Sequence, residues 1–327
     1  MSDEFSRIAR IREQLERASP GAAAPAGASG VELGVGDDAA VLCPSARRLV
    51  VSVDACVEGV HFLRRFASLE VLGARAMMAA ASDLAAMGAE PRWALCAIEL
   101  PTSASDADLE AMMRGLDEAA RRLGMAIVGG NLTEAPMIGL ALTVIGELNE
   151  PALQRKGARI GEGIYVRGAP GSAGLGLQLL LVGGELAPDE LPFARAWLEP
   201  VAEIEIGRAL LGVASAAIDT SDGLVQDLEH ILEASGVGAE LEVAKIPRAE
   251  GFEGVCARRG LDATQLALTG GEDYRVLFVA PPGPSADALG TRVGTIVAGA
   301  EAALIGPRGE RLILGPRGHQ HFSSAGD

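Results

Sequence analysis

The sequence predicts an α/β protein of two domains. Short β-rich runs bounded by Gly or Pro alternate with helical segments along the 327 residues. This length exceeds the usual size of a single domain, so two domains with separate cores are expected. The polar stretch 149–163 is the best linker candidate. We therefore expect an N-terminal α/β domain over 1–148 and a C-terminal α/β domain over 149–327.

Capping residues delimit two helices in the first half. Ser68 is the expected N-cap of the first, which stops at Gly88. Ser105 begins the second, with Asp108 three residues later as in a capping box, and Gly124 ends it. The strands expected around these helices are 49–53, 93–100, 125–128 and 138–148.

In the second half, strands are expected at 164–166, 216–218, 240–243 and 276–279. The Gly-rich segment 168–176 follows the first of these. It has two open readings, a phosphate cradle at a helix N-terminus or close packing between helices. It lacks the spacing of the lysine-bearing P-loop and the acid of a Rossmann motif.

Composition excludes several classes of protein. A formal charge of −16 argues against a general nucleic-acid surface, which needs an excess of Lys and Arg. The 4 cysteines lack the spacing of zinc ligands, as expected for small buried side chains in a reducing, cytoplasmic setting. No apolar stretch reaches membrane-spanning length, and the acidic start is no secretory signal.

Acidic residues recur where an apolar run meets a Gly-rich or polar break. One such turn is typical of a capped loop, whereas several predict a shared site. Magnesium prefers oxygen ligands and bridges carboxylates to phosphates, so these acids predict several Mg²⁺ ions and metal-assisted phosphoryl transfer. The segments are Gly36-Asp37-Asp38, Ser52-Val53-Asp54, Ser82-Asp83, Gly129-Gly130-Asn131, Asp219-Thr220-Ser221-Asp222 and Gly270-Gly271-Glu272-Asp273.

Simple capping does not account for three of these acids. Asp83 interrupts the Ala/Met-rich helical segment 76–87, where an unpaired buried carboxylate is costly and a metal would offset the cost. Asp219 and Asp222 flank the start of an amphipathic helix. Capping by Ser221 or Asp222 explains one of the two acids, not both.

Two further side chains are candidates for phosphate contacts. His61 follows Gly59 and precedes Phe62, and Arg155 lies in the linker. The alternative for His61 is a packed or solvated imidazole, and for Arg155 a solvated surface cation. No Ser/His/Asp arrangement nominates a covalent nucleophile, so no covalent intermediate is expected.

Together and in this order, the segments resemble the thiamine-monophosphate kinase family. This family belongs to the superfamily of aminoimidazole ribonucleotide synthetase and selenophosphate synthetase. The resemblance runs from about Glu4 to Phe322. The sharpest matches are Gly36-Asp37-Asp38-Ala39-Ala40, Asp54 with Val57-Glu58-Gly59-Val60-His61-Phe62, Ser82-Asp83-Leu84-Ala85-Ala86-Met87-Gly88, Ile218 to Gly223, and Gly270 to Tyr274.

The resemblance implies a two-domain aminoimidazole ribonucleotide synthetase-like fold with mixed sheets. The first domain would carry metal and ATP ligands and join a homodimer, and the second would complete the nucleotide and substrate site. ATP would phosphorylate thiamine monophosphate, with several Mg²⁺ ions. The implied Mg²⁺ ligands are Asp38, Ser52, Val53, Asp54, Asp83, Asn131, Asp219 and Asp222. The implied ATP contacts are Gly130, Asn131, Arg155 and Ser221, and the implied thiamine-monophosphate contacts are His61, Glu272 and His319.

Three residues depart from the family pattern. Val53 stands where the family usually has Thr and leaves only a backbone carbonyl. Asn131 stands in place of Asp and keeps an oxygen without its charge, and His319 replaces an aromatic platform. Two alternatives stay open: another ATP-dependent enzyme of the superfamily, or a noncatalytic nucleotide-binding regulator in which Val53 and Asn131 mark eroded metal sites.

Overall fold

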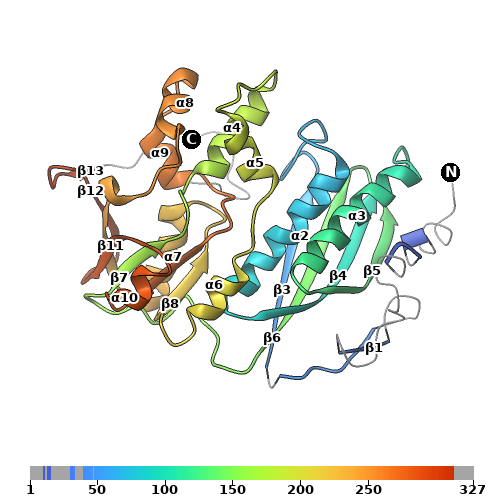
Figure 1. Cartoon of the computed structure of the whole chain (residues 1–327), viewed down its shortest axis with the longest axis horizontal. Helices are drawn as coiled ribbons and strands as arrows, with labels where there is room; N and C mark the ends of the chain where they lie inside the picture. The colour runs from blue at the N-terminus through green and yellow to red at the C-terminus, as the bar shows by residue number, and fades with distance from the viewer. Residues whose placement is uncertain (1–9, 12, 16–29, 34–39, 47, 313–327) are drawn as a thin grey trace. The chain divides into compact units, whose positions relative to one another are not determined.

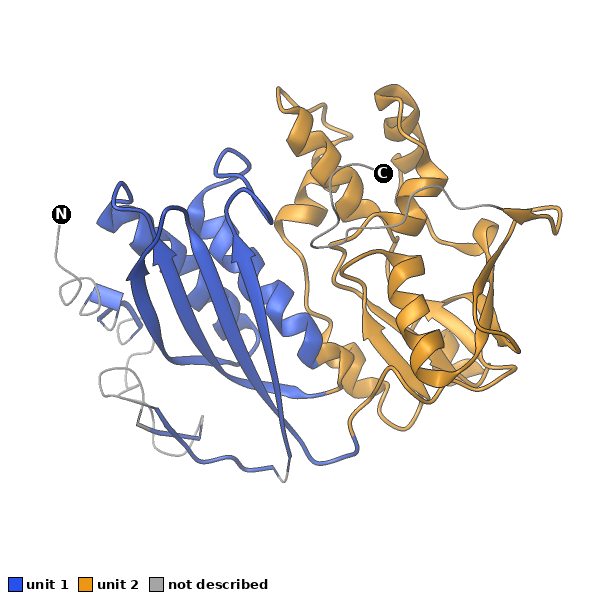
Figure 2. Ribbon diagram, turned by 180° about the vertical axis from the view of Figure 1, so that it is seen from behind, with its two compact units in different colours: residues 1–84, 89–151 blue, residues 85–88, 152–327 orange. Residues whose placement is uncertain are grey.

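The computed structural model describes residues 10–11, 13–15, 30–33, 40–46 and 48–312. The chain divides into two compact units, residues 1–84 with 89–151 and residues 85–88 with 152–327 (Figure 2). The short piece 85–88 groups with the second unit, and within that unit the Leu153 N–H donates to the Met87 carbonyl at 3.2 Å. No helix within the described ranges is long and apolar enough to cross a membrane.

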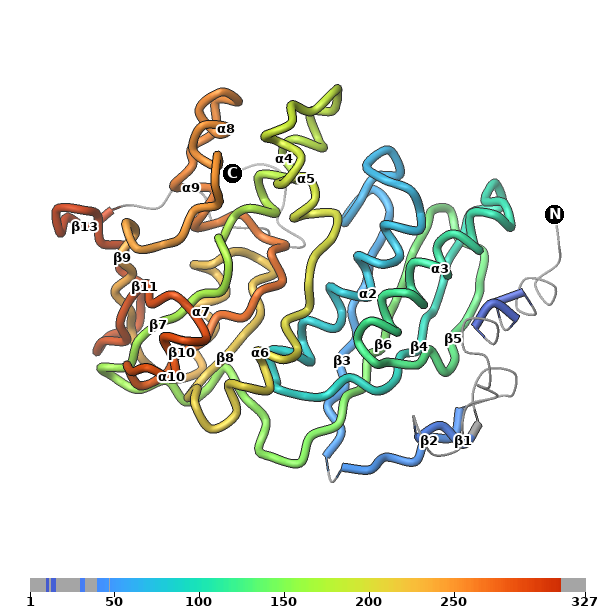
Figure 3. Tube along the Cα trace, in the orientation of Figure 1, coloured from blue at the N-terminus to red at the C-terminus, as the bar shows by residue number. Residues whose placement is uncertain are grey.

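A four-stranded mixed sheet forms the first unit, in the order β3-β6-β4-β5. Helices α2 and α3 run side by side along one face of it (Figures 1 and 3). Only the β4–β5 pair is parallel; the pairs β3–β6 and β4–β6 are antiparallel. The elements are β3 (Arg48–Val57), α2 (Leu69–Ala86), β4 (Glu90–Leu100), α3 (Asp106–Arg122), β5 (Ala126–Glu134) and β6 (Gly139–Leu148).

A small hairpin, β1 (Val31–Leu33) with β2 (Val41–Leu42), accompanies this sheet. Val31 joins Trp93 of β4 and Val128 of β5 in one buried apolar cluster. The cluster gives the β4–β5 side of the sheet its own small core.

The predicted helix boundaries in the first unit are confirmed. Ser68 Oγ accepts the Val71 N–H at 3.3 Å at the start of α2. Ser105 and Asp108 form a full capping box at the start of α3. Gly88 and Gly124 both take the positive φ that suits a residue just past a helix end.

Two strands run further than the sequence predicted. β3 continues through Asp54 to Val57, and β5 continues through Gly130 and Asn131 to Glu134. The segments holding Asp54 and Asn131 are therefore strand interior, and placing them on turns was wrong. Pairing decides this, because Asp54 lies opposite Leu142 of β6 and Gly130 lies opposite Cys96 of β4.

A seven-stranded mixed sheet forms the second unit, in the order β13-β12-β9-β11-β7-β10-β8. Its strands are β7 (Gly163–Val166), β8 (Ala216–Asp219), β9 (Gly238–Glu242), β10 (Val276–Ala280), β11 (Thr291–Val297), β12 (Ala302–Ile305) and β13 (Arg311–Leu312). Its helices are α4 (Ser172–Val182), α5 (Leu191–Leu198), α6 (Ile204–Ala209), α7 (Leu224–Ser235), the 3₁₀ turn η1 (Val243–Lys245), α8 (Phe252–Arg259), α9 (Ala263–Thr269) and α10 (Pro284–Asp287).

The core of the second unit lies between this sheet and α7. Leu228 and Ile231 of α7 are fully buried with Ile218 of β8 and Leu277 of β10. β10 is buried at every position and pairs with β7 on one side and β8 on the other. The β8–β10 pair is thus the rigid base of the two loops that follow β8 and precede β10.

Close contact between α2 and α3 depends on two glycines. A Cβ on Gly115 would lie 1.8 Å from the Glu70 carbonyl oxygen, and one on Gly73 would lie 2.5 Å from the Met112 carbonyl oxygen. These separations are far below van der Waals contact. The two helix backbones therefore approach as closely as they do only because neither position carries a side chain.

We expect Gly115→Ala to lower the free energy of unfolding by about 3 kcal/mol, because the helices must separate to admit one methyl group. Gly254, an exposed position of helix α8, is the matched control, since a Cβ there meets nothing within 4 Å. Gly254→Ala should raise stability by up to about 1 kcal/mol through helix propensity. Urea unfolding followed by circular dichroism measures both. Equal effects of the two changes would contradict the close approach.

Candidate functional site

The first unit brings together two of the predicted metal ligands. Ser52 Oγ donates to Asp83 Oδ2 at 2.5 Å, which joins the interior of β3 to helix α2. Ser52 and Asp54 are both half-buried and two residues apart on β3, so they share the face of the sheet that meets α2. Val53 lies between them and is 68% exposed. Its side chain points to the other face, and only its backbone carbonyl could serve as a ligand.

His61 is held in one orientation by the turn that follows β3. Its ring Nδ1 accepts the backbone N–H of Val57 at 3.0 Å, and the backbone N–H of His61 donates to the Val57 carbonyl at 2.8 Å. A neutral imidazole that accepts at Nδ1 carries its proton on Nε2. Nε2–H can then donate to an anionic oxygen, the chemistry expected of a phosphate contact.

Gly130 and Asn131 lie on β5, apart from this pair of ligands. Asp54 pairs with Leu142 of β6, Leu142 with Cys96 of β4, and Cys96 with Gly130, so two strands separate Asp54 from β5. A Cβ at position 130 would lie 1.9 Å from the Cys96 carbonyl oxygen, so close strand approach requires this glycine. The structure does not bring Asn131 next to Ser52 and Asp83, and its assignment to metal and ATP stays a prediction.

In the second unit, the acidic turn 219–223 connects β8 to α7. Asp219 is the last residue of β8, only 6% exposed, and pairs with Val276 of β10. Helix α7 begins at Leu224 with Gly223 as its N-cap and has no side-chain cap bond. The interpretation of Ser221 or Asp222 as the cap was therefore wrong.

The anchor of this turn is Asp227, a residue that the sequence analysis missed. Its Oδ2 accepts the N–H groups of Gly223 and Asp222, at 3.0 and 3.2 Å. Asp227 is 1% exposed. The available signal was an acid three residues after Leu224 and four before Ile231, on the apolar face of an amphipathic helix.

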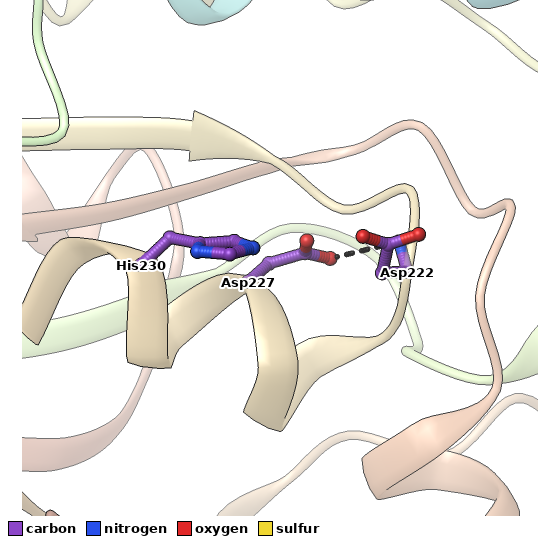
Figure 4. Close-up of side chains that lie close together, drawn as sticks. All are labelled: Asp222, Asp227 and His230. Atoms are coloured by element: carbon purple, nitrogen blue, oxygen red, sulfur yellow. Dashed lines mark hydrogen bonds between the residues drawn. The ribbon is translucent and has the colours of Figure 1, made fainter. Parts of the chain in front are cut away.

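Three side chains converge at this point. The ligating atoms of Asp222, Asp227 and His230 all lie within 4.8 Å of one another (Figure 4). Burial raises the pKa of the Asp227 carboxyl to about 8, and the negative charge of Asp219 adds to this effect. The hydrogen bond that Asp227 accepts from the Gly223 N–H acts in the opposite direction. The turn therefore places carboxylates where their charges would repel, which a divalent cation would offset. Asp222 and Asp227 offer the oxygen ligands that Mg²⁺ prefers, and His230 offers a nitrogen.

The loop before β10 carries Glu272, the predicted contact for the phosphate acceptor. Glu272 and Tyr274 have φ of 66° and 51°, the only positive values for residues other than glycine in the described ranges. Their N–H groups donate to the carbonyls of Ser221 and Thr220, at 2.7 and 2.8 Å. Backbone bonds thus tie this loop to the acidic turn, and the Glu272 carboxylate accepts the indole N–H of Trp197 on α5.

The Asp273 carboxylate lies at the start of α4 and shows how the Gly-rich segment 168–176 is used. Its carboxylate accepts the N–H groups of Gly171 and Ala173, at 2.6 and 2.9 Å, at the N-terminus of α4. Burial raises the pKa of this carboxyl to about 7, against the two backbone bonds that lower it. A Cβ on Gly176 would lie 2.0 Å from the Phe193 carbonyl oxygen. Side-chain capping and close helix packing account for this segment, rather than a phosphate cradle.

Arg155 and Ser221 lie at opposite ends of α7. Ser235, the last residue of the helix, donates to the Arg155 carbonyl at 3.3 Å, whereas Ser221 precedes the first turn. Twelve residues of helix span about 18 Å. The ATP contacts expected for these two residues stay predictions. Asp38 and His319 lie outside the described residues.

Comparison with known proteins agrees with this fold and these motifs. Residues 36–148 match the family model described as AIR synthase related protein, N-terminal domain. The chain is thus an α/β protein of the aminoimidazole ribonucleotide synthetase-like class. It is 35% identical to the thiamine-monophosphate kinase of Escherichia coli (strain K12), over 98% of each chain. It is 34% identical to that of Aquifex aeolicus (strain VF5), over 88% of this chain and 92% of the relative.

A solved structure, AaThiL complexed with AMPPCP and TMP, matches at a TM-score of 0.78 and 31% identity, over 98% of this chain and 97% of that one. The chain belongs to the thiamine-monophosphate kinase family.

We expect Asp227→Ala to lower the free energy of unfolding by about 2 kcal/mol, because the buried N–H groups of Asp222 and Gly223 lose their acceptor. Asp227→Asn keeps an acceptor oxygen and should stay within about 1 kcal/mol of the natural protein. Chemical unfolding with divalent ions chelated measures both. Equal stability of the two variants would show that these bonds do not hold the turn.

Proposed function

We propose that this chain transfers the γ-phosphoryl group of ATP to thiamine monophosphate. An oxygen of the acceptor phosphate attacks the γ-phosphorus, the bond to the β–γ bridging oxygen breaks, and ADP leaves with thiamine diphosphate as product. The observation that carries the proposal is the 35% identity to a thiamine-monophosphate kinase over 98% of the chain, together with the presence of the acidic motifs. A related structure holds both an ATP analogue and TMP by its description.

This reaction needs little proton transfer, because the acceptor is already an anionic phosphate oxygen. Its difficulty is to bring two polyanions together. Side chains that hold divalent cations answer that need. The oxygen donors of Ser52 and Asp83 on the first unit, and of Asp219 and Asp222 on the second, fit Mg²⁺. When bound, Mg²⁺ supplies positive charge that offsets the repulsion between the phosphates.

The remaining residues divide between the two substrates. We assign Gly130, Asn131, Arg155 and Ser221 to ATP, and His61, Glu272 and His319 to thiamine monophosphate. The hydrogen bond that His61 Nδ1 accepts supports the acceptor assignment, because it places the proton of a neutral imidazole on Nε2, a donor whose chemistry suits a phosphate oxygen. Asp38, Val53, Asp54 and Asn131 complete the proposed metal set.

A homodimer joined through the first unit is part of the proposal, as is a cytoplasmic location. The outer edge strand β3 carries exposed apolar side chains on the face away from α2. Val51 is 59% exposed, and Leu49 and Val53, two residues before and after it on the same face, are also exposed. Such a row on an edge strand favours burial against a second copy of the sheet.

Phosphorus NMR of the protein with MgATP and thiamine monophosphate tests the reaction. We expect the resonances of a new diphosphate ester and of ADP.

Asp83→Asn should reduce the rate at least ~10²-fold, equivalent to about 3 kcal/mol of transition-state stabilisation. Glu118→Gln, on the exposed face of α3, should leave the rate unchanged. Absence of any diphosphate ester from the natural protein would reject the proposal, and full activity of Asp83→Asn would remove Asp83 from the site.

A multi-ion site also predicts the dependence on Mg²⁺. Activity should continue to rise with free Mg²⁺ after all ATP is complexed, because carboxylates on both units need ions beyond the one that ATP carries. A titration of Mg²⁺ at fixed, saturating ATP measures this rise. Saturation at one equivalent per ATP would count against ions held by the protein.

A further inference from the structure

Trp197 combines complete burial with a polar bond to a predicted substrate contact. It lies on α5, is 0% exposed, and donates its indole N–H to Glu272 Oε2. Complete burial restricts rotation of the ring. Phe193, one turn earlier on α5, is itself buried against Phe252 of α8 in an edge-on contact with centroids 5.8 Å apart. A buried indole with its N–H aimed at a carboxylate is a rigid donor.

The backbone of Glu272 is equally constrained. The residue adopts φ of 66°, in the left-handed region, and its N–H donates to the Ser221 carbonyl at 2.7 Å. Residues other than glycine persist in this conformation when the surrounding structure over-determines it, and such positions cluster at ligand-binding sites. The main chain is thus positioned by the acidic turn and the side chain by Trp197.

We propose that Trp197 is a positioning residue for the acceptor substrate. The indole N–H fixes the direction of the Glu272 carboxylate so that it meets the nitrogen-containing rings of thiamine monophosphate. These rings carry an amino group and a cationic nitrogen, and a carboxylate complements both. The inference rests on the proposed function. It adds to that function a residue that none of the motifs contains.

Preorganisation is the physical basis. A glutamate has three side-chain torsions, and ordering them on binding reduces affinity. Trp197 orders the carboxylate before the substrate arrives. The benefit appears in acceptor binding, whereas ATP binding and the chemical step do not depend on this side chain.

Kinetics of Trp197→Phe test the proposal, because Phe keeps an aromatic ring and lacks the N–H. We expect the KM for thiamine monophosphate to rise about tenfold, as for loss of a hydrogen bond to a charged group. The KM for ATP and kcat should stay within about twofold. Trp93→Phe is the matched control, since Trp93 is also 0% exposed and lies in the first unit. It should leave both KM values unchanged.

A double-mutant cycle shows whether Trp197 acts through Glu272. Glu272→Ala, which removes the acceptor of the indole N–H, should itself raise the KM for thiamine monophosphate, and adding Trp197→Phe should raise it by less than twofold more. Equal, independent effects in the two backgrounds would overturn the proposal. So would an equal rise of both KM values in Trp197→Phe, which is the result expected of a purely structural role.

Fluorescence gives a readout that does not require Trp197 to be replaced. The chain has 2 tryptophans, so Trp93→Phe leaves Trp197 as the only one. Thiamine monophosphate should change its emission with a saturable dependence on concentration, and ATP without Mg²⁺ should not. Saturable binding by calorimetry with no change in emission would overturn the role of Trp197. Absence of both thiamine-monophosphate binding and turnover in the natural protein would instead reject the proposed function.

Discussion

The site on the second unit depends on the antiparallel pairing of β8 with β10. This pairing sets Asp219 opposite Val276 and so places the turn after β8 beside the loop before β10. The backbone bonds from Glu272 and Tyr274 to Ser221 and Thr220 continue the contact beyond the strands. Segments about 50 residues apart in sequence are thereby held together, so the proposed metal-binding turn and the proposed acceptor contact share a single framework.

Repulsion between buried carboxylates destabilises this arrangement of the turn and the loop. Asp222 and Asp227 lie close together, the charge of Asp219 acts on Asp227, and Asp219 and Asp227 are almost fully buried. The elevated pKa of Asp227 expresses the same repulsion and desolvation. A structure selected only for stability would avoid such a cluster. Its presence beside a loop with two left-handed residues is typical of a site where binding offsets local strain.

In both units, glycines allow the backbones of neighbouring helices to approach closely. Gly115 brings α3 against α2, and Gly176 brings α4 against α5. Asp273 accepts hydrogen bonds from the N-terminus of α4 and lies in the same loop as Glu272, so α4 and the proposed substrate contact are fixed together. A Gly-rich segment after a strand is therefore weak evidence for phosphate binding. A carboxylate of the protein itself occupies the N–H groups that a phosphate would need.

Local patterns in the sequence were sufficient for the helix caps at Ser68 and Ser105, the centres of eight strands and the family, because capping, alternation and motif order involve residues near one another in the chain. They missed β11 (Thr291–Val297) and the short strands β1, β2, β12 and β13. Strand ends were not predictable in this way, since β3 and β5 extend as far as β6 and β4 can pair with them. The roles of Asp227 and Trp197 could not be derived from the sequence either, although an acid on the apolar face of a helix was a signal for Asp227. Each depends on a partner whose position is set by tertiary packing, and neither residue belongs to a recognised motif. Short-range interactions decided the elements, whereas long-range pairing and burial decided which side chains meet.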